Sequence, residues 1–195
     1  SFVPHVALEA AKAGFEPKLV KLHRGEHRAP EYLALNPNAQ VPVLVVDGKP
    51  LTQIVAIGDY LDRRFPQAGL LPQEPWQRTQ ALSRLAWMNS TPHTCMTRVF
   101  FPERYAESEG ARSEVKQRAA QEFRGHLERV QESLPAQPYV LFDAYAFTLL
   151  RWGGFAAIDP RSLPKYFSYV ERAMEAPPAQ PALARERIGP DTYKG

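Results

Sequence analysis

The sequence contains a single cysteine, Cys95, among its 195 residues, so no disulfide can form within the chain. It also lacks any run of about 20 apolar residues, the length that a membrane-spanning helix needs. No secretory segment with an apolar core precedes the first expected helix. We therefore expect a cytoplasmic protein that does not act in a membrane.

Positive charge is not gathered in one stretch of the chain. The 24 lysine and arginine residues are mixed with 21 aspartate and glutamate residues, which gives a formal net charge of +3. A nucleic-acid-binding surface normally gathers its basic residues on one face, so we expect no nucleic-acid partner. Histidine, cysteine and aspartate show no spacing typical of a metal site, so no metal is expected either.

The first third of the chain alternates between helical and strand-like patterns. The expected elements are a helix at 3–13, a strand at 16–22, a brief helix at 31–35, a strand at 41–46, a return strand at 50–52 and a helix at 54–64. The turn dipeptide Asp47-Gly48 joins the last two strands and predicts a hairpin. This order indicates a small α/β domain over residues 1–65.

Residues 66–76 contain three prolines and a glycine, which predict a linker. Beyond them only helical periodicity is present. The expected helices lie at 75–98 with an interruption at Pro92, at 111–134, at 143–153 and at 164–175. We therefore expect an all-α domain, a helical bundle, over residues 77–195.

The α/β domain lacks one expected strand. Its order of elements is typical of a thioredoxin-like domain, in which a central strand comes before the first helix. Without that strand, the segments 16–22 and 41–46 would lie two strand spacings apart, about 9 to 10 Å, too far to hydrogen-bond. We therefore expect the whole protein to have residues upstream of Ser1.

Four segments together resemble the glutathione transferase family, particularly its bacterial beta class. They are SFVPHVALEAA at 1–11, GEHRAPEYLALNPNAQVPVLVVDG at 25–48, LTQIVAIGDYLDRRFP at 51–66 and PPAQPALA at 177–184. The pairing of NPxxxVPxL with LTQxxAI is specific, and the likeness covers nearly the whole chain. It implies a homodimeric detoxification enzyme with glutathione as co-substrate.

The resemblance implies a glutathione site made of Gln40, Val41, Pro42, Gln53 and Ile54. Pro42 would follow a cis peptide bond, which turns the backbone of Val41 toward the cysteinyl part of glutathione. Gln53 would meet the γ-glutamyl end. The family usually has serine, threonine or asparagine where this chain has Ile54, so we expect binding that is weakened but not abolished.

The resemblance implies that the main residue that activates the glutathione thiol lies upstream of the given chain. In the beta class this residue is a cysteine, which comes immediately before the position matched by Ser1. Ser1 matches a serine of that motif, and two interpretations stay open. Either its hydroxyl donates to the glutathione sulfur, or it only caps the first helix.

The resemblance implies an electrophile pocket that contains Asn89, His93 and Met96. Asn89 matches a polar residue of beta-class enzymes, whereas the expected His-Lys pair reads Met96-Thr97, which implies a different or more apolar pocket. His93 either lines the cleft or has a structural role. Cys95 is expected to be a small buried residue.

A further irregularity lies at Phe142 and Asp143. The family normally has a loop and a capping box, Ser/Thr-x-x-Asp, between the equivalents of these two residues. Either residues are absent here or the box has been lost, and a spatial gap between Phe142 and Asp143 would favour the first alternative.

The leading hypothesis is a transferase that conjugates the glutathione thiolate to a small hydrophobic electrophile. Two other classes stay open. One is a glutathione-dependent thiol-disulfide reductase, peroxidase or isomerase. The other is a non-catalytic protein that uses the same scaffold for binding.

Overall fold

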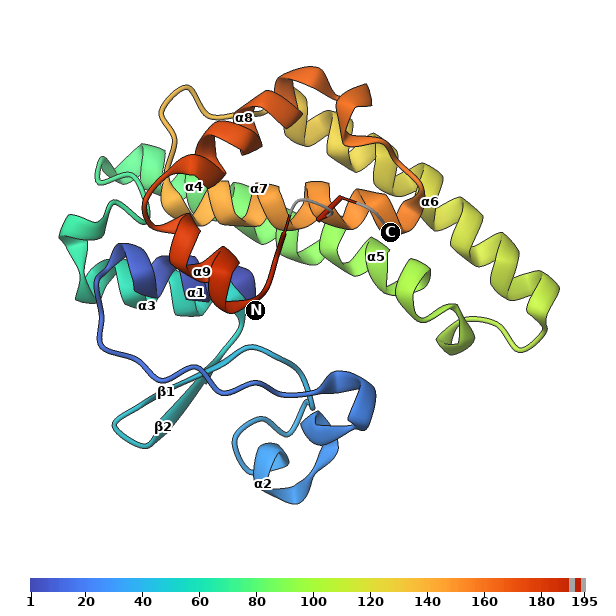
Figure 1. Ribbon diagram of the computed structural model, residues 1–195, viewed down its shortest axis with the longest axis horizontal. Coiled ribbons are helices and arrows are strands. Elements are labelled where there is room, and N and C mark those ends of the chain that lie inside the picture. The colour runs from blue at the N-terminus through green and yellow to red at the C-terminus, as the bar shows by residue number, and fades with distance from the viewer. Residues whose placement is uncertain (190–191, 194–195) are drawn as a thin grey trace.

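Helices dominate the computed structural model, which describes residues 1–189 and 192–193 (Figure 1). Its helices and strands are α1 (Phe2–Ala10), α2 (Pro30–Leu33), β1 (Val43–Val46), β2 (Lys49–Thr52), α3 (Ile54–Arg64), α4 (Pro75–Ser90), α5 (Pro92–Phe100), α6 (Glu109–Glu132), α7 (Val140–Gly153), α8 (Pro164–Glu175) and α9 (Ala179–Arg185). No helix within this part of the chain is long and apolar enough to cross a membrane.

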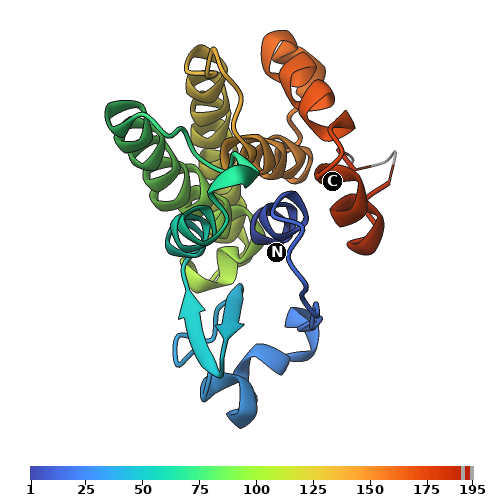
Figure 2. The ribbon, with the colours of Figure 1, turned by 90° about the vertical axis from the view of Figure 1, so that its left-hand side faces the viewer.

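The strands and α2 form a lobe beside a larger helical body (Figures 1 and 2). Helix α7 lies at the centre of that body and contacts α1, α4, α5, α6 and α8. Most of its side chains are buried, on every side of the helix, as expected for a helix surrounded by others. Helix α1 comes first in the sequence but packs against α7 and α9, so it belongs to the same core.

The predicted hairpin is confirmed. Strands β1 and β2 pair antiparallel, with Val43 opposite Thr52 and Val46 opposite Lys49. The two turn residues, Asp47 and Gly48, both have positive φ, at 49° and 77°. This combination is typical of the tight hairpin turns that match the twist of the two strands.

The strand predicted at 16–22 is wrong. Residues 15–21 have no regular structure, and Leu22–Arg24 form a short 3₁₀ turn. The sheet in the described part of the chain contains only β1 and β2. An extended segment becomes a strand only when a neighbour supplies hydrogen bonds, and no strand within residues 1–189 and 192–193 lies beside this one.

The predicted interruption of the first long helix is confirmed. Helix α4 ends at Ser90 and α5 begins with Pro92. Proline lacks the N–H that a continuous helix would require, so the chain restarts at this position. The limits of 1–65 and 77–195 for two domains stay a prediction, because α3 also packs against α4.

Helix α7 passes through Phe142 and Asp143 without a break. Its N-cap residue is Tyr139, whose side chain makes no capping hydrogen bond. Asp143 instead lies inside the first turn and accepts a hydrogen bond from the hydroxyl of Tyr169. Helix α7 therefore begins without a capping box here, and the two sequence-based alternatives stay predictions.

Candidate functional site

The hairpin brings two of the expected ligand-binding segments together. Val41 and Pro42 are joined by a cis peptide bond directly before β1, and Gln53 directly follows β2. Because Val43 lies opposite Thr52, one further step in the same register puts Pro42 beside Gln53. Both segments therefore lie at the end of the hairpin where the chain enters α3.

The loop before Val41 is held by hydrogen bonds to its backbone. The carbonyl of Gln40 accepts one from the Tyr32 hydroxyl and one from the Asn36 side-chain amide, each at 2.7 Å. Asn36 is only 3% exposed, and its side-chain oxygen accepts from the Asn38 N–H at 3.1 Å. Our sequence reasoning missed Tyr32 and Asn36, although asparagine in such a segment is typical of a turn that its side chain stabilises.

Gln53 occupies an unusual backbone position at the start of α3. It is the N-cap residue, with φ 71° and ψ 118°, and its exposed side chain makes no capping hydrogen bond. The first N–H groups of a helix lack intrahelical partners, so those of Ile54 and Val55 point out of the helix start. This end of α3 also carries a partial positive charge. The arrangement suits a carboxylate.

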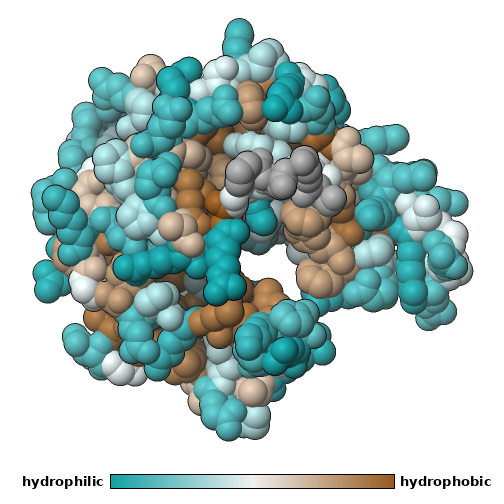
Figure 3. Space-filling view, in the orientation of Figure 1, coloured by the Kyte–Doolittle hydropathy of each residue, from teal (hydrophilic) through white to brown (hydrophobic). Residues whose placement is uncertain are grey.

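Ser1 is the N-cap residue of α1, but its hydroxyl makes no capping hydrogen bond. The N-terminus lies on the side of the helical body that faces the hairpin (Figures 1 and 2). Figure 3 shows a hollow between the helical body and the lobe, with hydrophobic residues along parts of its border. The participation of Ser1 in activating the glutathione thiol stays a prediction.

A second group of expected residues is connected by a buried tyrosine. The hydroxyl of Tyr145, on α7, donates to Oδ1 of Asn89 at 2.9 Å and contacts Nδ1 of His93 at 2.8 Å. A phenol has one proton, so the contact with His93 is made by an Nδ1–H donor. Nε2 of His93 is then left as a hydrogen-bond acceptor. Tyr145 was not among the residues predicted from the sequence.

Burial controls the charge of this group. Burial lowers the pKa of His93 and raises the pKa of Tyr145, so both side chains are neutral at pH 7. The His93 ring packs edge-on against Trp152 at 4.7 Å between centroids, and Phe100 packs against Trp152 at 5.5 Å. The result is an apolar surface with one neutral imidazole.

Met96 does not belong to this surface. It is fully buried, together with Cys95 and Val99, on the face of α5 that points into the core. Met96 therefore serves packing in this structure, and we correct its assignment as a pocket residue. Cys95, at 2% exposure, is buried as predicted.

Replacing Tyr145 with phenylalanine should lower the free energy of unfolding by about 1 to 3 kcal/mol, because Asn89 and His93 both lose a buried partner. Urea unfolding measures this loss. Tyr105→Phe is the matched control, since the Tyr105 hydroxyl bonds Thr97 at an exposed position where water can replace it. Equal losses in the two variants would contradict the conclusion that the buried hydrogen bonds of Tyr145 stabilise the fold.

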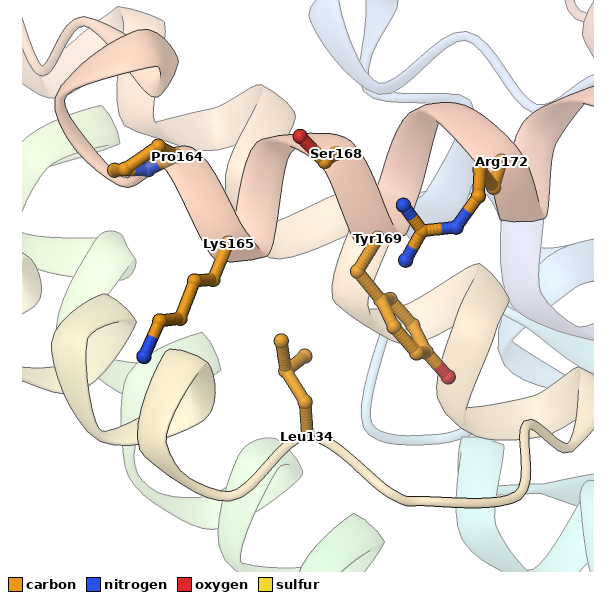
Figure 4. A pocket seen from close by; sticks show the side chains of 6 residues that line it. All are labelled: Leu134, Pro164, Lys165, Ser168, Tyr169 and Arg172. Carbon is orange, nitrogen blue, oxygen red and sulfur yellow. The ribbon is translucent and has the colours of Figure 1, made fainter.

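Depressions elsewhere on the helical body do not include the expected residues. One, of about 450 Å³, is lined by Leu134 from the segment after α6 and by five side chains of α8 (Figure 4). Another lies beside Trp76 and Trp87 of α4. Neither is lined by a residue of the hairpin end or by the group around Tyr145.

Known proteins resemble this chain in both sequence and structure. The family model for the glutathione S-transferase N-terminal domain matches residues 1–63. The glutathione S-transferase GstA of Escherichia coli O157:H7 is 30% identical over 200 residues, which cover 96% of this chain and 94% of that protein. The maleylacetoacetate isomerase of Pseudomonas aeruginosa is 43% identical over 83 residues, which cover 41% of this chain and 39% of the isomerase.

A solved structure extends the comparison to the whole fold. The sphingomonad glutathione S-transferase, complexed with glutathione, has a TM-score of 0.82 and 30% sequence identity, with 96% of this chain and 94% of that chain covered. A small thioredoxin-like domain, followed by a helical domain, is the arrangement predicted from the sequence, and within the described residues its sheet has two strands. The chain belongs to the glutathione S-transferase family.

Proposed function

We propose that this protein is a glutathione transferase that joins the glutathione thiolate to a small hydrophobic electrophile. The main support is the hairpin register, which puts the cis Val41–Pro42 bond beside Gln53 and the start of α3. The full-length relatives with transferase names, one of them solved with glutathione, give a second line of support.

In the proposed complex, the backbone of Val41 pairs with the cysteinyl part of glutathione as one more strand would. The γ-glutamyl carboxylate lies at the start of α3, where helix amides and the helix dipole favour an anion. Gln53 binds the same end through its exposed side chain. Ile54 supplies only its backbone N–H, which weakens this part of the site.

Catalysis would consist of thiolate stabilisation and positioning. The hydroxyl of Ser1, at the start of α1, is the group proposed to approach the glutathione sulfur. The electrophile would lie against the helical body near Asn89 and His93, where the rings of Trp152 and Phe100 supply apolar contact. We also propose a cytoplasmic homodimer that acts in detoxification, as the family resemblance implies.

A glutathione-dependent isomerase is the second candidate. It is favoured by the 43% identity to a maleylacetoacetate isomerase, which is confined to fewer than half of the residues of either protein. The two reactions differ in stoichiometry. A transferase consumes one glutathione per product, whereas an isomerase returns it, so free thiol measured during turnover distinguishes them.

Gln53→Ala should weaken glutathione binding about tenfold, the effect of losing one hydrogen bond to a charged group at an exposed position. Calorimetric titration of reduced glutathione into the full chain measures the dissociation constant. Cys95→Ala is the control, since Cys95 lies buried between α5 and α6. Equal weakening in the two variants would contradict the proposed site.

A further inference from the structure

Three side chains with metal-binding chemistry meet between α5 and α6. They are Cys95, Glu122 and His126, whose sulfur, oxygen and nitrogen atoms all lie within 4.8 Å of one another. Glu122 and His126 are four residues apart on α6 and so share one face of that helix. Cys95 faces them from α5, which packs along α6.

The imidazole of His126 has an atom without a hydrogen-bond partner. His126 is 8% exposed, and its Nε2 makes no hydrogen bond within residues 1–189 and 192–193. The nearest carboxylate oxygen, Oε1 of Glu122, lies 3.5 Å away, beyond good hydrogen-bond distance. Buried polar atoms of this kind normally have a partner, so this one points to a ligand.

We propose that Cys95, Glu122 and His126 bind a divalent transition-metal ion of the zinc type. Thiolate sulfur, imidazole nitrogen and carboxylate oxygen are the three ligand types that Zn²⁺ prefers. Three protein ligands leave a fourth position for water, and the 45% exposure of the Glu122 side chain provides a route of entry.

The two oxygen atoms of the Glu122 carboxylate face different partners. Arg98 pairs with Oε2 at 2.8 Å, which leaves Oε1 on the side of His126 for the metal. The positive charge of Arg98 opposes a cation, so this arginine weakens binding without blocking it. The metal must also displace the Cys95 thiol from its 3.4 Å contact with the Ala119 carbonyl.

This group is separate from the proposed electrophile surface. Cys95 follows His93 by two residues, which is about 200° around a helix, so the two side chains leave α5 on opposite faces. His93 contacts Tyr145 of α7, whereas Cys95 contacts α6. Metal binding between α5 and α6 therefore does not depend on the glutathione site.

The sequence did not reveal this group because its members come from two helices. Cys95 and Glu122 are separated by the end of α5 and much of α6. Glu122 and His126 alone have the spacing of an ordinary ion pair on an exposed helix face. Only the packing of α5 against α6 adds the thiol.

Titration of the full chain with Co²⁺ tests the proposal, because tetrahedral cobalt bound to a thiolate has charge-transfer absorption in the near ultraviolet. We expect this absorption to saturate at one ion per chain and to disappear when Zn²⁺ is added. Absence of the absorption up to millimolar Co²⁺ would overturn the proposal.

Variants identify the ligands. Cys95→Ser should abolish the charge-transfer absorption, and Glu122→Gln and His126→Gln should each weaken Co²⁺ binding at least tenfold. Glu128→Gln is the matched control, because Glu128 also lies on α6, is 49% exposed and pairs with Arg124 at 3.1 Å.

Arg98→Gln should tighten Co²⁺ binding, since it removes the opposing charge. Unchanged affinity in both Glu122→Gln and His126→Gln would mean that the thiol alone holds the ion and would overturn the site. Circular dichroism of each variant checks that it is folded, and zinc content measured by mass spectrometry of the purified full chain gives a second readout.

Discussion

Asp62→Ala should lower the free energy of unfolding by about 3 to 5 kcal/mol, the effect of removing one partner of a buried ion pair. Asp62, on α3, is 2% exposed and pairs with Arg78 of α4. Its other carboxylate oxygen accepts the Leu71 N–H at 3.0 Å. The substitution leaves both groups without this partner and loosens the contact between α3 and α4. Urea unfolding followed by circular dichroism measures the loss.

Asp59→Ala is the matched control for this effect. Asp59 lies one turn earlier on α3 and also pairs with Arg78, but its side chain is 28% exposed. Water can therefore replace the lost contact, and we expect a loss of about 1 kcal/mol or less. A loss equal to that of Asp62→Ala would show that burial of Asp62 is not what makes the pair important.

Elements with a strong local pattern could be predicted from the sequence. The hairpin at β1 and β2 was predicted from β-branched residues around Asp47-Gly48, and the limits predicted for α8, 164–175, agree with the structure. Helix α3 was predicted over 54–64 from its apolar face and has those limits as well. In each case the information lies within about a dozen neighbouring residues.

Features that depend on distant partners could not be predicted in this way. The segment 16–22 has strand-like residues, but a strand also requires a neighbour. The sequence pattern does not distinguish Asp62 from a solvent-exposed charge on an amphipathic helix, because its partner Arg78 lies on another helix. The sequence pattern likewise does not distinguish Tyr145 from the apolar residues of α7, although its hydroxyl makes hydrogen bonds with both Asn89 and His93.

The candidate site was predicted in part, and by resemblance. The family motifs identified the cis bond before Pro42, and the structure confirms that bond. They do not specify Asn36, which holds the loop from inside. Met96 was assigned by its match to a polar pair, yet a methionine at this position is free to turn into the core, since its burial needs no hydrogen bond.

Asp143→Asn should raise the free energy of unfolding by about 2 to 3 kcal/mol above pH 6. Burial raises the pKa of Asp143 to about 6, although the hydrogen bond from Tyr169 acts in the opposite direction. The charged carboxylate is therefore unfavourable in the folded protein. An asparagine oxygen can accept the same hydrogen bond without a charge, so the contact is kept.

The sign of the pH dependence follows from the direction of this shift. The pKa of Asp143 is higher in the folded state than the ordinary value of 3.8, so the folded state binds more protons than the unfolded state between about pH 4 and pH 6. The free energy of unfolding therefore falls through this range as the pH rises. The gain from Asp143→Asn should be small at pH 4 and nearly complete at pH 7.

Urea unfolding of both proteins at several values between pH 4 and pH 8 measures this gain. Tyr169→Phe provides the companion test, because loss of its hydroxyl removes the hydrogen bond that lowers the pKa of Asp143. In that background the gain from Asp143→Asn should be larger and should reach its full size at a higher pH. A gain of equal size at pH 4 and pH 8 would mean that the amide packs better whatever the charge, and that the buried carboxylate is not the cause.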